Sequence, residues 1–450
     1  MKNDLTKGSV FWKLFQFSLP YLLSCFLQTF YGMADLYITG QFYGADTITA
    51  VSVGSQVTHM LTVVIVGLAM GTTVNIGLAV GAGNQRKVAA IIGNTVILFS
   101  VFAFLLTVLL LCANNGILRI LSVPRESWAQ AKSYLTVCFA GVPFIVAYNV
   151  ISSIFRGMGD SKSPLYFVGI AGVFNVAFDY LLIGGFSMGA KGAAIATVMS
   201  QAFSVAAALP ALCISQKKRR ASLVRKDFRL TGGTAKELLK VGAPIALQDG
   251  LIQVAFLVIT VIANRRGVDA AAAVGIVEKM IGFMFLVPSA MLSAVSAVAA
   301  QNAGAGFHDR GKKALGCGIL ITVATGMVFT VSCQFFAETL IGFFAKDEPT
   351  VILMGGQYLR SYVFDCIFAG IHFCFSGYFC AYQKSMISFA HNLAAIILVR
   401  IPGAYYASKL FPDSLYPMGL AAPLGSVLSA VICVIFYIIF RKEFVKKVSN

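Results

Sequence analysis

Long apolar segments alternate with short polar ones along the whole chain. Each apolar segment is at least as long as the stretch of about 20 residues with which an α-helix crosses the hydrocarbon core of a bilayer. Several are longer than a bilayer requires, which predicts helices that are tilted or that extend into solvent. The pattern predicts an all-α integral membrane protein with twelve transmembrane helices, at residues 11–37, 48–76, 88–113, 127–155, 163–185, 190–213, 235–262, 269–302, 312–337, 350–380, 385–410 and 416–440.

The composition supports a membrane protein. Hydrophobic residues make up 58% of the 450 residues and charged residues only 12%, whereas soluble domains carry roughly 25% charged residues. A soluble fold of this size would lack the charge that a hydrated surface needs. The apolar stretch after the basic N-terminal segment is too long for a cleaved signal peptide and contains Pro20 and Asp35. We therefore expect it to be retained as the first span.

The basic residues are concentrated on one side of the predicted membrane. The net charge is 35 − 18 = +17, which in a soluble protein would suggest a nucleic-acid partner. An even number of spans places both termini on the same side, which collects 24 of the basic residues against 8 on the other. Because cytoplasmic loops are enriched in Lys and Arg, we expect a multi-pass protein of the cell membrane with both termini in the cytoplasm and no nucleic-acid partner.

A basic linker interrupts the series of spans between the sixth and the seventh. It runs from Gln216 to Lys240 and contains the cluster Lys217, Lys218, Arg219 and Arg220. We interpret it as a solvated connection, and the alternative is that it binds an anionic lipid or a regulator.

The segments before and after this linker resemble each other. Four short matches occur in the same order and at a nearly constant shift along the chain. They pair Leu14–Pro20 with Leu238–Pro244, Gly44–Val51 with Gly267–Val274, Gly81–Lys87 with Gly304–Lys312, and Gly192–Ala194 with Gly419–Ala421. The matches predict a parallel repeat of two six-helix lobes, at 1–215 and 235–450, joined by a cytoplasmic linker at 216–234. Repeated bundles around a central cavity are typical of alternating-access transporters.

Acidic residues inside the predicted spans are the first candidates for a functional site. Ionisable side chains are costly inside a bilayer and usually have a function there. The candidates are Asp35, Asp179, Asp249, Glu278 and Asp365.

Two of these acids share a helix face with other polar residues. Gln28, Tyr31 and Asp35 follow the spacing i, i+3, i+7, and Asn175 and Asp179 are four residues apart, so each group lies on one side of its helix. A carboxyl group in apolar surroundings can carry a proton, and carboxylate, amide and hydroxyl oxygens together can coordinate a small hard cation such as Na⁺. The alternative is a structural hydrogen bond between spans.

No pattern typical of an enzyme is present in the sequence. The four histidines show no metal-binding spacing, the ten cysteines include no C-x-x-C pair, and no G-x-x-x-x-G-K-[ST] loop occurs. Without such a loop the chain cannot use ATP as its energy source. We expect no catalytic activity, no metal and no cofactor apart from a coupling ion.

Four groups of residues together resemble the multidrug and toxic compound extrusion (MATE) family of the MOP flippase superfamily. They are Asp35 with Gly40 and Gly44–Val51, the run Arg156–Pro164, Asn175 and Asp179 with Gly192–Thr197, and Gln301–Asn302 with Gly304–Gly306. The resemblance covers nearly the whole chain and implies two six-helix lobes around a V-shaped cavity. It also implies export of amphipathic, often cationic, small molecules in exchange for Na⁺ or H⁺. We expect a bacterial protein that contacts membrane lipids and acts as a monomer.

The resemblance to the DinF-type branch of this family implies a polar site in the N-terminal lobe. The pattern of that branch falls on Gln28, Tyr31, Asp35, Tyr134, Asn149, Asn175, Asp179 and Thr197. Pro20 matches a proline at which that branch is thought to bend span one. Ser152 stands where an archaeal relative has a second amide, so the preference for H⁺ or Na⁺ cannot be transferred. Since the NorM-type branch uses acids of the other lobe, Asp249, Glu278 and Asp365 form a minority C-lobe site.

These observations predict a cation-coupled antiporter for amphipathic, cationic drugs or metabolites. Asp35, Asn175, Asp179 and Thr197 would bind the coupling ion, and Gln28, Tyr31, Tyr134 and Asn149 would line a polar cavity for the substrate. The charges inside the spans are mostly acidic, which favours cationic cargo. The nearest alternative is a lipid-linked oligosaccharide flippase of the same superfamily, which would carry more cationic residues in its cavity. A membrane enzyme or a receptor is a more distant alternative.

Overall fold

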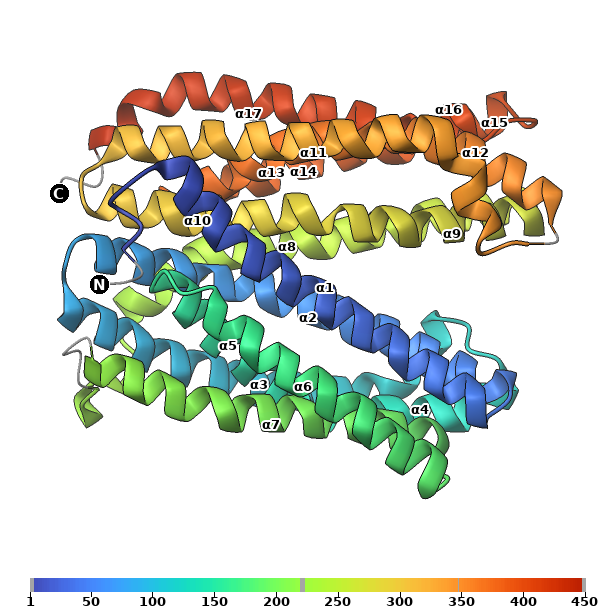
Figure 1. The fold of residues 1–450 in the computed structure, drawn as a ribbon, viewed down its shortest axis with the longest axis horizontal. Coiled ribbons are helices and arrows are strands. Elements are labelled where there is room, and N and C mark those ends of the chain that lie inside the picture. Colours follow the sequence, from blue (N-terminus) through green and yellow to red (C-terminus); the bar gives the residue numbers. More distant parts are fainter. Residues whose placement is uncertain (1–3, 219–222, 347, 447–450) are drawn as a thin grey trace. The chain divides into compact units, whose positions relative to one another are not determined.

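The described part of the chain consists of helices joined by short turns and loops (Figure 1). The computed structural model describes residues 4–218, 223–346 and 348–446, and no β-strand occurs within them. The first half contains α1 (Val10–Phe42), α2 (Ala45–Gly81), α3 (Gln85–Ile120), α4 (Arg125–Ala140), α5 (Val142–Gly157), α6 (Lys162–Asp179), the π-helix η1 (Tyr180–Gly185), α7 (Gly189–Lys218) and the 3₁₀ turn η2 (Arg225–Asp227). The second contains α8 (Gly232–Asn264), α9 (Val268–Met284), α10 (Leu286–Gly304), α11 (His308–Gly342), α12 (Pro349–Tyr362), α13 (Asp365–Ala381), α14 (Ser385–Ala395), the π-helix η3 (Ile396–Arg400), α15 (Ile401–Leu410), α16 (Tyr416–Gly419) and α17 (Ala421–Lys446).

These helices form the twelve predicted spans. Eleven spans of 24–37 residues are each long and apolar enough to cross a membrane, and α4 and α5 together form one more span. The α4–α5 span is bent by 47° next to Gly141. Pro143 lies in the first turn of α5, where its ring has no N–H to donate to a carbonyl of α4. The prediction of a twelve-helix membrane protein is therefore confirmed, and most of the spans extend beyond the predicted ends.

The described chain divides into two compact units. Unit 1 contains Leu19–Gly242, and unit 2 contains Asp4–Ser18 together with the described residues from Ala243 onward. These units differ from the predicted lobes, 1–215 and 235–450, in where they place the first turns of α1 and α8. In the structure these turns belong to unit 2 and unit 1 respectively, and each helix changes unit next to its proline, Pro20 or Pro244.

Each unit thus holds the start of one helix whose remainder lies in the other unit, together with the residues before α1 in the case of unit 2. Side chains of the unit contact these exchanged segments. In unit 2 the Asn302 amide donates to the Leu5 carbonyl at 3.2 Å, and Arg310 donates to the Gly8 carbonyl at 2.9 Å. In unit 1 the Asn75 amide donates to the Glu237 carbonyl at 3.3 Å. Asn75 and Asn302 both lie in the second span of their half and are related by the shift of the repeat. The exchange is therefore made in the same way in both units.

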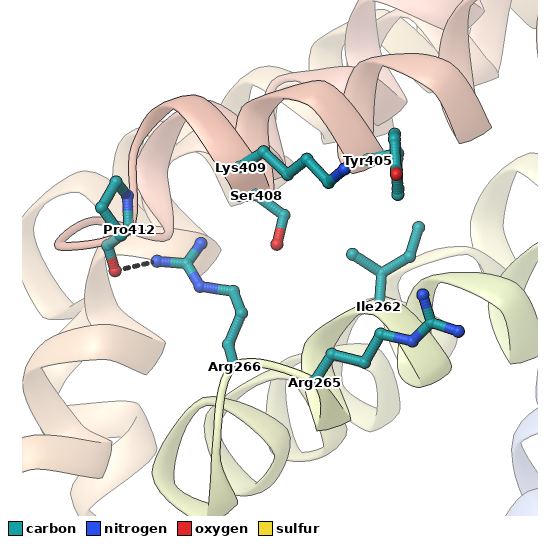
Figure 2. Close-up of a pocket in the computed structure, with 7 residues that line it drawn as sticks. All are labelled: Ile262, Arg265, Arg266, Tyr405, Ser408, Lys409 and Pro412. Carbon is teal, nitrogen blue, oxygen red and sulfur yellow. Dashed lines mark hydrogen bonds between the residues drawn. The ribbon is translucent and has the colours of Figure 1, made fainter.

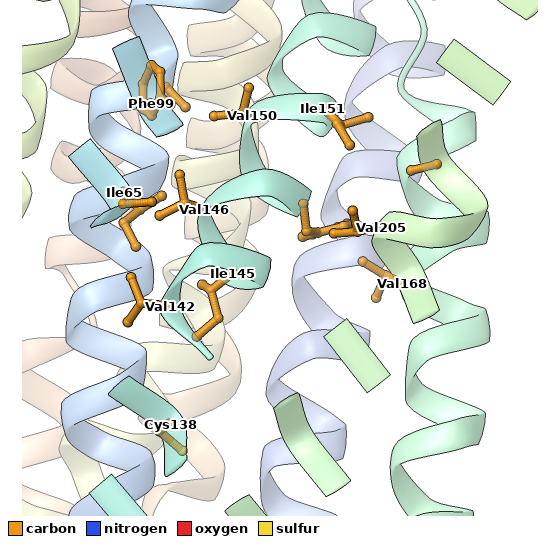
Figure 3. Close-up of a cluster of buried hydrophobic side chains, with 14 of the residues drawn as sticks. Ile65, Phe99, Cys138, Val142, Ile145, Val146, Val150, Ile151, Val168 and Val205 are labelled. Carbon is orange, nitrogen blue, oxygen red and sulfur yellow. The ribbon is translucent and has the colours of Figure 1, made fainter. Parts of the chain in front are cut away.

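One helix segment lies at the centre of each unit. In unit 1, α5 packs against α2, α3 and α7, and Figure 3 shows its buried Val146 and Ile151 among Ile65, Phe99 and Val205 of these helices. In unit 2, α13 packs against α10, α11 and α17, which occupy the corresponding spans. The two units thus share their packing as well as their order of helices.

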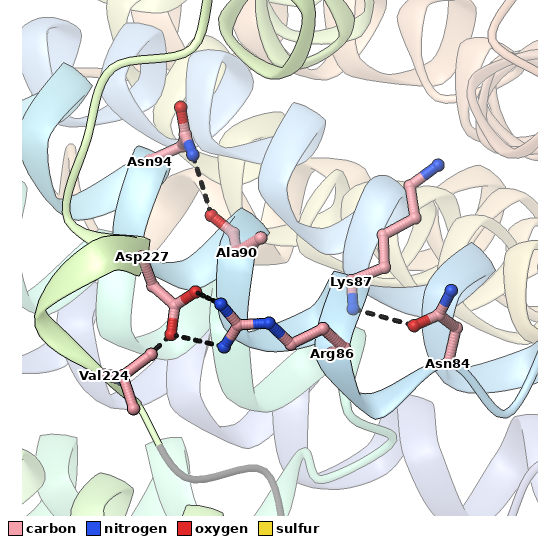
Figure 4. Close-up of polar contacts among 7 residues, drawn as sticks. All are labelled: Asn84, Arg86, Lys87, Ala90, Asn94, Val224 and Asp227. Carbon is pink, nitrogen blue, oxygen red and sulfur yellow. Dashed lines mark hydrogen bonds and ion pairs between the residues drawn. The ribbon is translucent and has the colours of Figure 1, made fainter.

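The part of the linker from Val224 to Thr231 is docked on unit 1 (Figure 4). The carboxylate of Asp227 receives two bonds from the Arg86 guanidinium, at 2.9 and 3.1 Å, and one from the Val224 N–H at 2.9 Å. The Asn94 side-chain oxygen accepts from the backbone N–H of Thr231 at 2.7 Å. The segment predicted as a solvated connection is therefore partly fixed on α3. Arg219 and Arg220, in the predicted basic cluster, lie outside the described residues.

Candidate functional site

Two carboxyl groups meet inside unit 1. Asp35 lies in the middle of α1 and is 2% exposed, and Asp179, the last residue of α6, is fully buried. Their side chains lie within hydrogen-bonding reach of each other, and the Asn175 amide lies beside Asp35. The π-helix η1 begins directly after Asp179. Such local widenings of a helix are frequent at functional sites because they redirect the side chains next to them.

Thr197 completes this cluster from α7. Its hydroxyl lies 3.1 Å from Asp35 Oδ2 and 3.0 Å from the Ala193 carbonyl of its own helix. The structure therefore brings together Asp35, Asn175, Asp179 and Thr197, which the sequence placed in three separate spans. We refer to these four residues as the carboxyl cluster.

The hydrogen-bonding groups of the carboxyl cluster are mostly unsatisfied. Asp35 Oδ1, both carboxylate oxygens of Asp179 and both polar atoms of the Asn175 amide are buried and accept or donate no bond among the described residues. Buried polar atoms nearly always have a partner, and two adjacent buried carboxylates cannot both stay ionised without one. No described Lys or Arg forms an ion pair with either acid. A shared proton or a small cation would satisfy these atoms.

Two tyrosines lie near the carboxyl cluster. Tyr134 is 1% exposed and close enough to Asp35 and Asp179 to interact with both electrostatically. Its ring fills the space in front of Gly54, where a Cβ atom would lie 2.1 Å from Tyr134 Cδ1. The Tyr31 hydroxyl accepts a bond from the Gln201 amide at 3.1 Å. Together with the Thr197–Asp35 bond, this contact connects α1 to α7 by side chains.

The sequence interpretation missed Gln201. It also did not show which of the other polar residues lie close to the carboxyl cluster and which lie away from it. Gln201 follows Thr197 by four residues, so the helical spacing could have identified it. Gln28 lies instead within hydrogen-bonding reach of the Tyr148 hydroxyl. The Asn149 amide donates to the Ile145 carbonyl of its own helix at 2.8 Å. These contacts do not join Gln28 or Asn149 to the carboxyl cluster, and their assignment to a substrate cavity stays a prediction.

Pro20 lies inside a continuous helix. The α1 helix extends through Pro20 from Val10 to Phe42, and the Ser24 hydroxyl donates to the Pro20 carbonyl at 2.9 Å. Bending of span one at this proline remains a prediction.

The acids of the predicted C-lobe site have different surroundings from those of the carboxyl cluster. Asp365 forms a buried ion pair with Arg400, a residue of the π-helix η3. Glu278 accepts a bond from the Thr260 hydroxyl at 3.1 Å. Asp249 lies beside Gln248 on α8. Because Arg400 already neutralises Asp365, this acid is less suited than Asp35 or Asp179 to bind a cation.

A buried cation in unit 1 was not among the predicted site residues. Arg156 is the penultimate residue of α5 and is 4% exposed, with its guanidinium 4.8 Å from the centre of the Tyr21 ring. No described carboxylate pairs with it, and its Nε has no partner among the described residues. The sequence provided little indication that Arg156 is buried, because a basic residue at a predicted helix end usually lies in solvent.

Comparison with known proteins identifies the family. The family model MatE matches residues 20–181 and 244–406. The chain belongs to the MATE family of transporters. The two matches cover the same part of each half, from the proline of its first helix into its fifth span, so the predicted internal repeat is confirmed. Membership makes the chain a membrane transporter and not an enzyme, as predicted.

Individual relatives agree with this membership. The probable multidrug resistance protein YoeA of Bacillus subtilis is 28% identical over 77% of this chain and 76% of its own. The FAD transporter of Shewanella oneidensis is 26% identical over 93% of this chain and 92% of its own. The crystal structure of MATE in complex with MaL6 matches with a TM-score of 0.90 over 99% of this chain and 100% of that one. At 20% identity, this last likeness shows the shared MATE fold alone.

Proposed function

We propose that this MATE transporter is a secondary antiporter that exports amphipathic, cationic drugs or metabolites in exchange for H⁺ or Na⁺. The observation that carries the proposal is the carboxyl cluster, in which two buried acids adjoin with no described cation paired to them. An adjacent pair of this kind binds a proton or a small cation strongly. The excess of basic residues on the side of the termini supports a cytoplasmic position for both of them.

The carboxyl cluster would couple ion binding to a change of shape through α1. Thr197 and Gln201 of α7 hold Asp35 and Tyr31 of α1 by one side-chain bond each. A proton or Na⁺ bound to Asp35 changes which hydrogen bonds its carboxyl group can accept. It therefore changes how α1 is held against α7. An ion shifts a conformational equilibrium only through such a difference in affinity between two states. Cargo that prefers the ion-free state would then expel the ion, and the ion would expel the cargo.

Each residue of the carboxyl cluster would have a separate role. Asp35 and Asp179 would hold the ion, while Asn175 and Thr197 would supply neutral oxygen ligands for Na⁺ or hydrogen bonds for a shared proton. Oxygen atoms are the ligands that small hard cations prefer. Tyr134 would close one side of the site.

A second candidate cargo is an anionic amphipathic molecule. Arg156 supports it, because a cation that is buried without a carboxylate partner is costly unless an anion approaches it. The Shewanella oneidensis relative, named an FAD transporter, is consistent with such a cargo. The relatives named multidrug resistance proteins favour the first candidate.

The proposal is tested by transport into proteoliposomes under imposed gradients. We expect a pH gradient or a Na⁺ gradient, applied separately, to drive accumulation of a fluorescent cationic dye, and we expect the dye to drive counterflow of the same ion. Flavin nucleotide replaces the dye in a second arm, to test anionic cargo. Transport that is equally fast without either gradient would contradict antiport, and movement of a lipid-linked oligosaccharide alone would favour the flippase.

A further inference from the structure

A basic cavity lies in unit 2 at the end of α8 and α15 (Figure 2). It has a volume of about 370 Å³ and is lined by Ile262, Arg265, Arg266, Tyr405, Ser408, Lys409 and Pro412. Arg265 and Arg266 follow the last residue of α8, and Lys409 is the penultimate residue of α15. The cavity therefore combines three cationic side chains with a tyrosine and a serine.

Arg266 anchors one side of this cavity and is already occupied. Its guanidinium donates to the carbonyls of Phe411, Pro412 and Ser414, just after the end of α15. These acceptors include the carbonyl groups that a helix end and the following turn leave without partners, and the negative end of the helix dipole favours a cation there. Asp413 is the acid that acts on Arg266 electrostatically. Arg266 thus fixes the α15–α16 turn and is not free to bind a further anion.

Arg265 and Lys409 are not neutralised in this way. Both side chains are exposed, and neither forms an ion pair with a carboxylate among the described residues. The Lys409 ammonium lies 4.6 Å from the centre of the Tyr405 ring, and Arg265 is close enough to act electrostatically on the same tyrosine. In Figure 2 both cations lie on the Tyr405 side of the cavity, away from Pro412. Two unpaired cations therefore converge beside one aromatic hydroxyl.

Exposed apolar side chains adjoin the lining residues along the chain. Exposed fractions are 52% for Val261 of α8, and 71% and 51% for Leu410 and Phe411 at the end of α15. Both helices belong to spans long enough to cross a bilayer. Basic and aromatic side chains at the end of a span lie at the level of the lipid headgroups. An occupant with a negative group and an apolar tail would match both the cavity and these exposed apolar side chains at the ends of the two helices.

We propose that this cavity binds the phosphate group of an anionic phospholipid, in the leaflet on the side opposite both termini. Arg265 and Lys409 contact the phosphate, the Tyr405 and Ser408 hydroxyls donate to its oxygens, and the acyl chains lie along Val261 and Leu410. The size of the cavity suits one headgroup. This inference is independent of the antiport mechanism, because it uses no residue of the carboxyl cluster.

The test measures lipid binding to the purified full chain by native mass spectrometry. Phosphatidylglycerol, phosphatidylcholine and inorganic phosphate are titrated separately onto the wild type and onto the double variant Arg265→Gln/Lys409→Gln. We expect the variant to bind its tightest phosphatidylglycerol about 25-fold more weakly, the product of roughly fivefold for each lost cation at a membrane surface. Phosphatidylcholine binding should not change.

A matched control removes two other exposed cations. Arg119→Gln/Lys132→Gln takes the same charge from the last turn of α3 and the middle of α4 in unit 1, where both side chains are exposed, and should bind phosphatidylglycerol as the wild type does. Equal affinity of the wild type and the Arg265/Lys409 variant would overturn the proposal, and so would an equal loss in the control. Displacement of the lipid by inorganic phosphate at millimolar concentration would also overturn it, since the site would then select a soluble anion.

Discussion

Replacing Asp35 or Asp179 by Asn is expected to lower gradient-driven transport by between about fivefold and 150-fold, the range that typical coupling free energies span. The amide has almost the shape of the carboxyl group and can still accept the Thr197 hydrogen bond, so the fold should survive. It cannot become negatively charged, however, and a single remaining carboxylate has lost the neighbour that makes the pair bind an ion strongly. Transport into proteoliposomes under the more effective of the two gradients measures the effect.

The matched control for this prediction is Asp46→Asn. Asp46 is an exposed acid in the first turn of α2, so the substitution makes the same chemical change away from the carboxyl cluster. Asp46→Asn should transport at the wild-type rate. If Asp35→Asn and Asp179→Asn also transport at the wild-type rate, the carboxyl cluster does not bind the coupling ion. Elution of each variant as a single symmetric peak in size-exclusion chromatography confirms that it is folded.

Replacing Gly71 by Ala is expected to lower the free energy of unfolding by about 1–3 kcal/mol, as overpacking in a close contact does. A Cβ atom at Gly71 of α2 would lie 2.1 Å from the backbone oxygen of Leu238 in the first turns of α8. The contact is reciprocal, because a Cβ at Gly242 would lie 2.1 Å from the Leu68 oxygen. Small residues at such crossings allow two membrane helices to approach closely, and here they hold an exchanged turn in unit 1.

Thermal unfolding in detergent tests this second prediction. The control is Gly116→Ala in α3, where a Cβ would meet nothing within 4 Å. Because Ala is the better helix former by roughly 0.5–1 kcal/mol, the control should melt at or above the wild-type temperature. A Gly71→Ala variant that melts with the control would show that the first turns of α8 do not depend on this approach.

The membrane fold could be predicted almost completely, because the length of an apolar segment is a local property. All twelve predicted spans lie within the observed ones. The exchange of the first turns between the units could not be predicted in this way. It depends on contacts such as Asn302 with the Leu5 carbonyl, between residues 297 positions apart in the chain, and no local pattern encodes them.

The carboxyl cluster could be predicted in part. Helical spacing placed Asn175 and Asp179 on one face, but only the fold brings them to Asp35 on another helix. The ion pair of Asp365 with Arg400 was not visible either, since the two residues lie 35 positions apart and the sequence treated them separately. This pair also marks a difference between the halves. The π-helix of span five follows Asp179, whereas the π-helix of span eleven ends in Arg400.

The duplicated scaffold therefore carries different charges in its two copies. Unit 1 has two adjoining acids without a described basic partner, and unit 2 has an acid that is paired with an arginine at the corresponding span. The helices that pack around α5 in unit 1 nevertheless correspond to those that pack around α13 in unit 2. The difference explains why the proposal assigns the coupling ion to unit 1.

The most direct test of this assignment is to count the ions released when cargo binds to the purified transporter in detergent. Cationic dye is titrated onto the protein in weakly buffered solution, with protons followed by a pH indicator and Na⁺ by radioactive tracer. We expect release of about one coupling ion per dye bound by the wild type and by Asp46→Asn, because ion and cargo exclude each other. We expect no release from Asp35→Asn/Asp179→Asn. Equal release from that double variant and the wild type would contradict the assignment of the coupling ion to the carboxyl cluster.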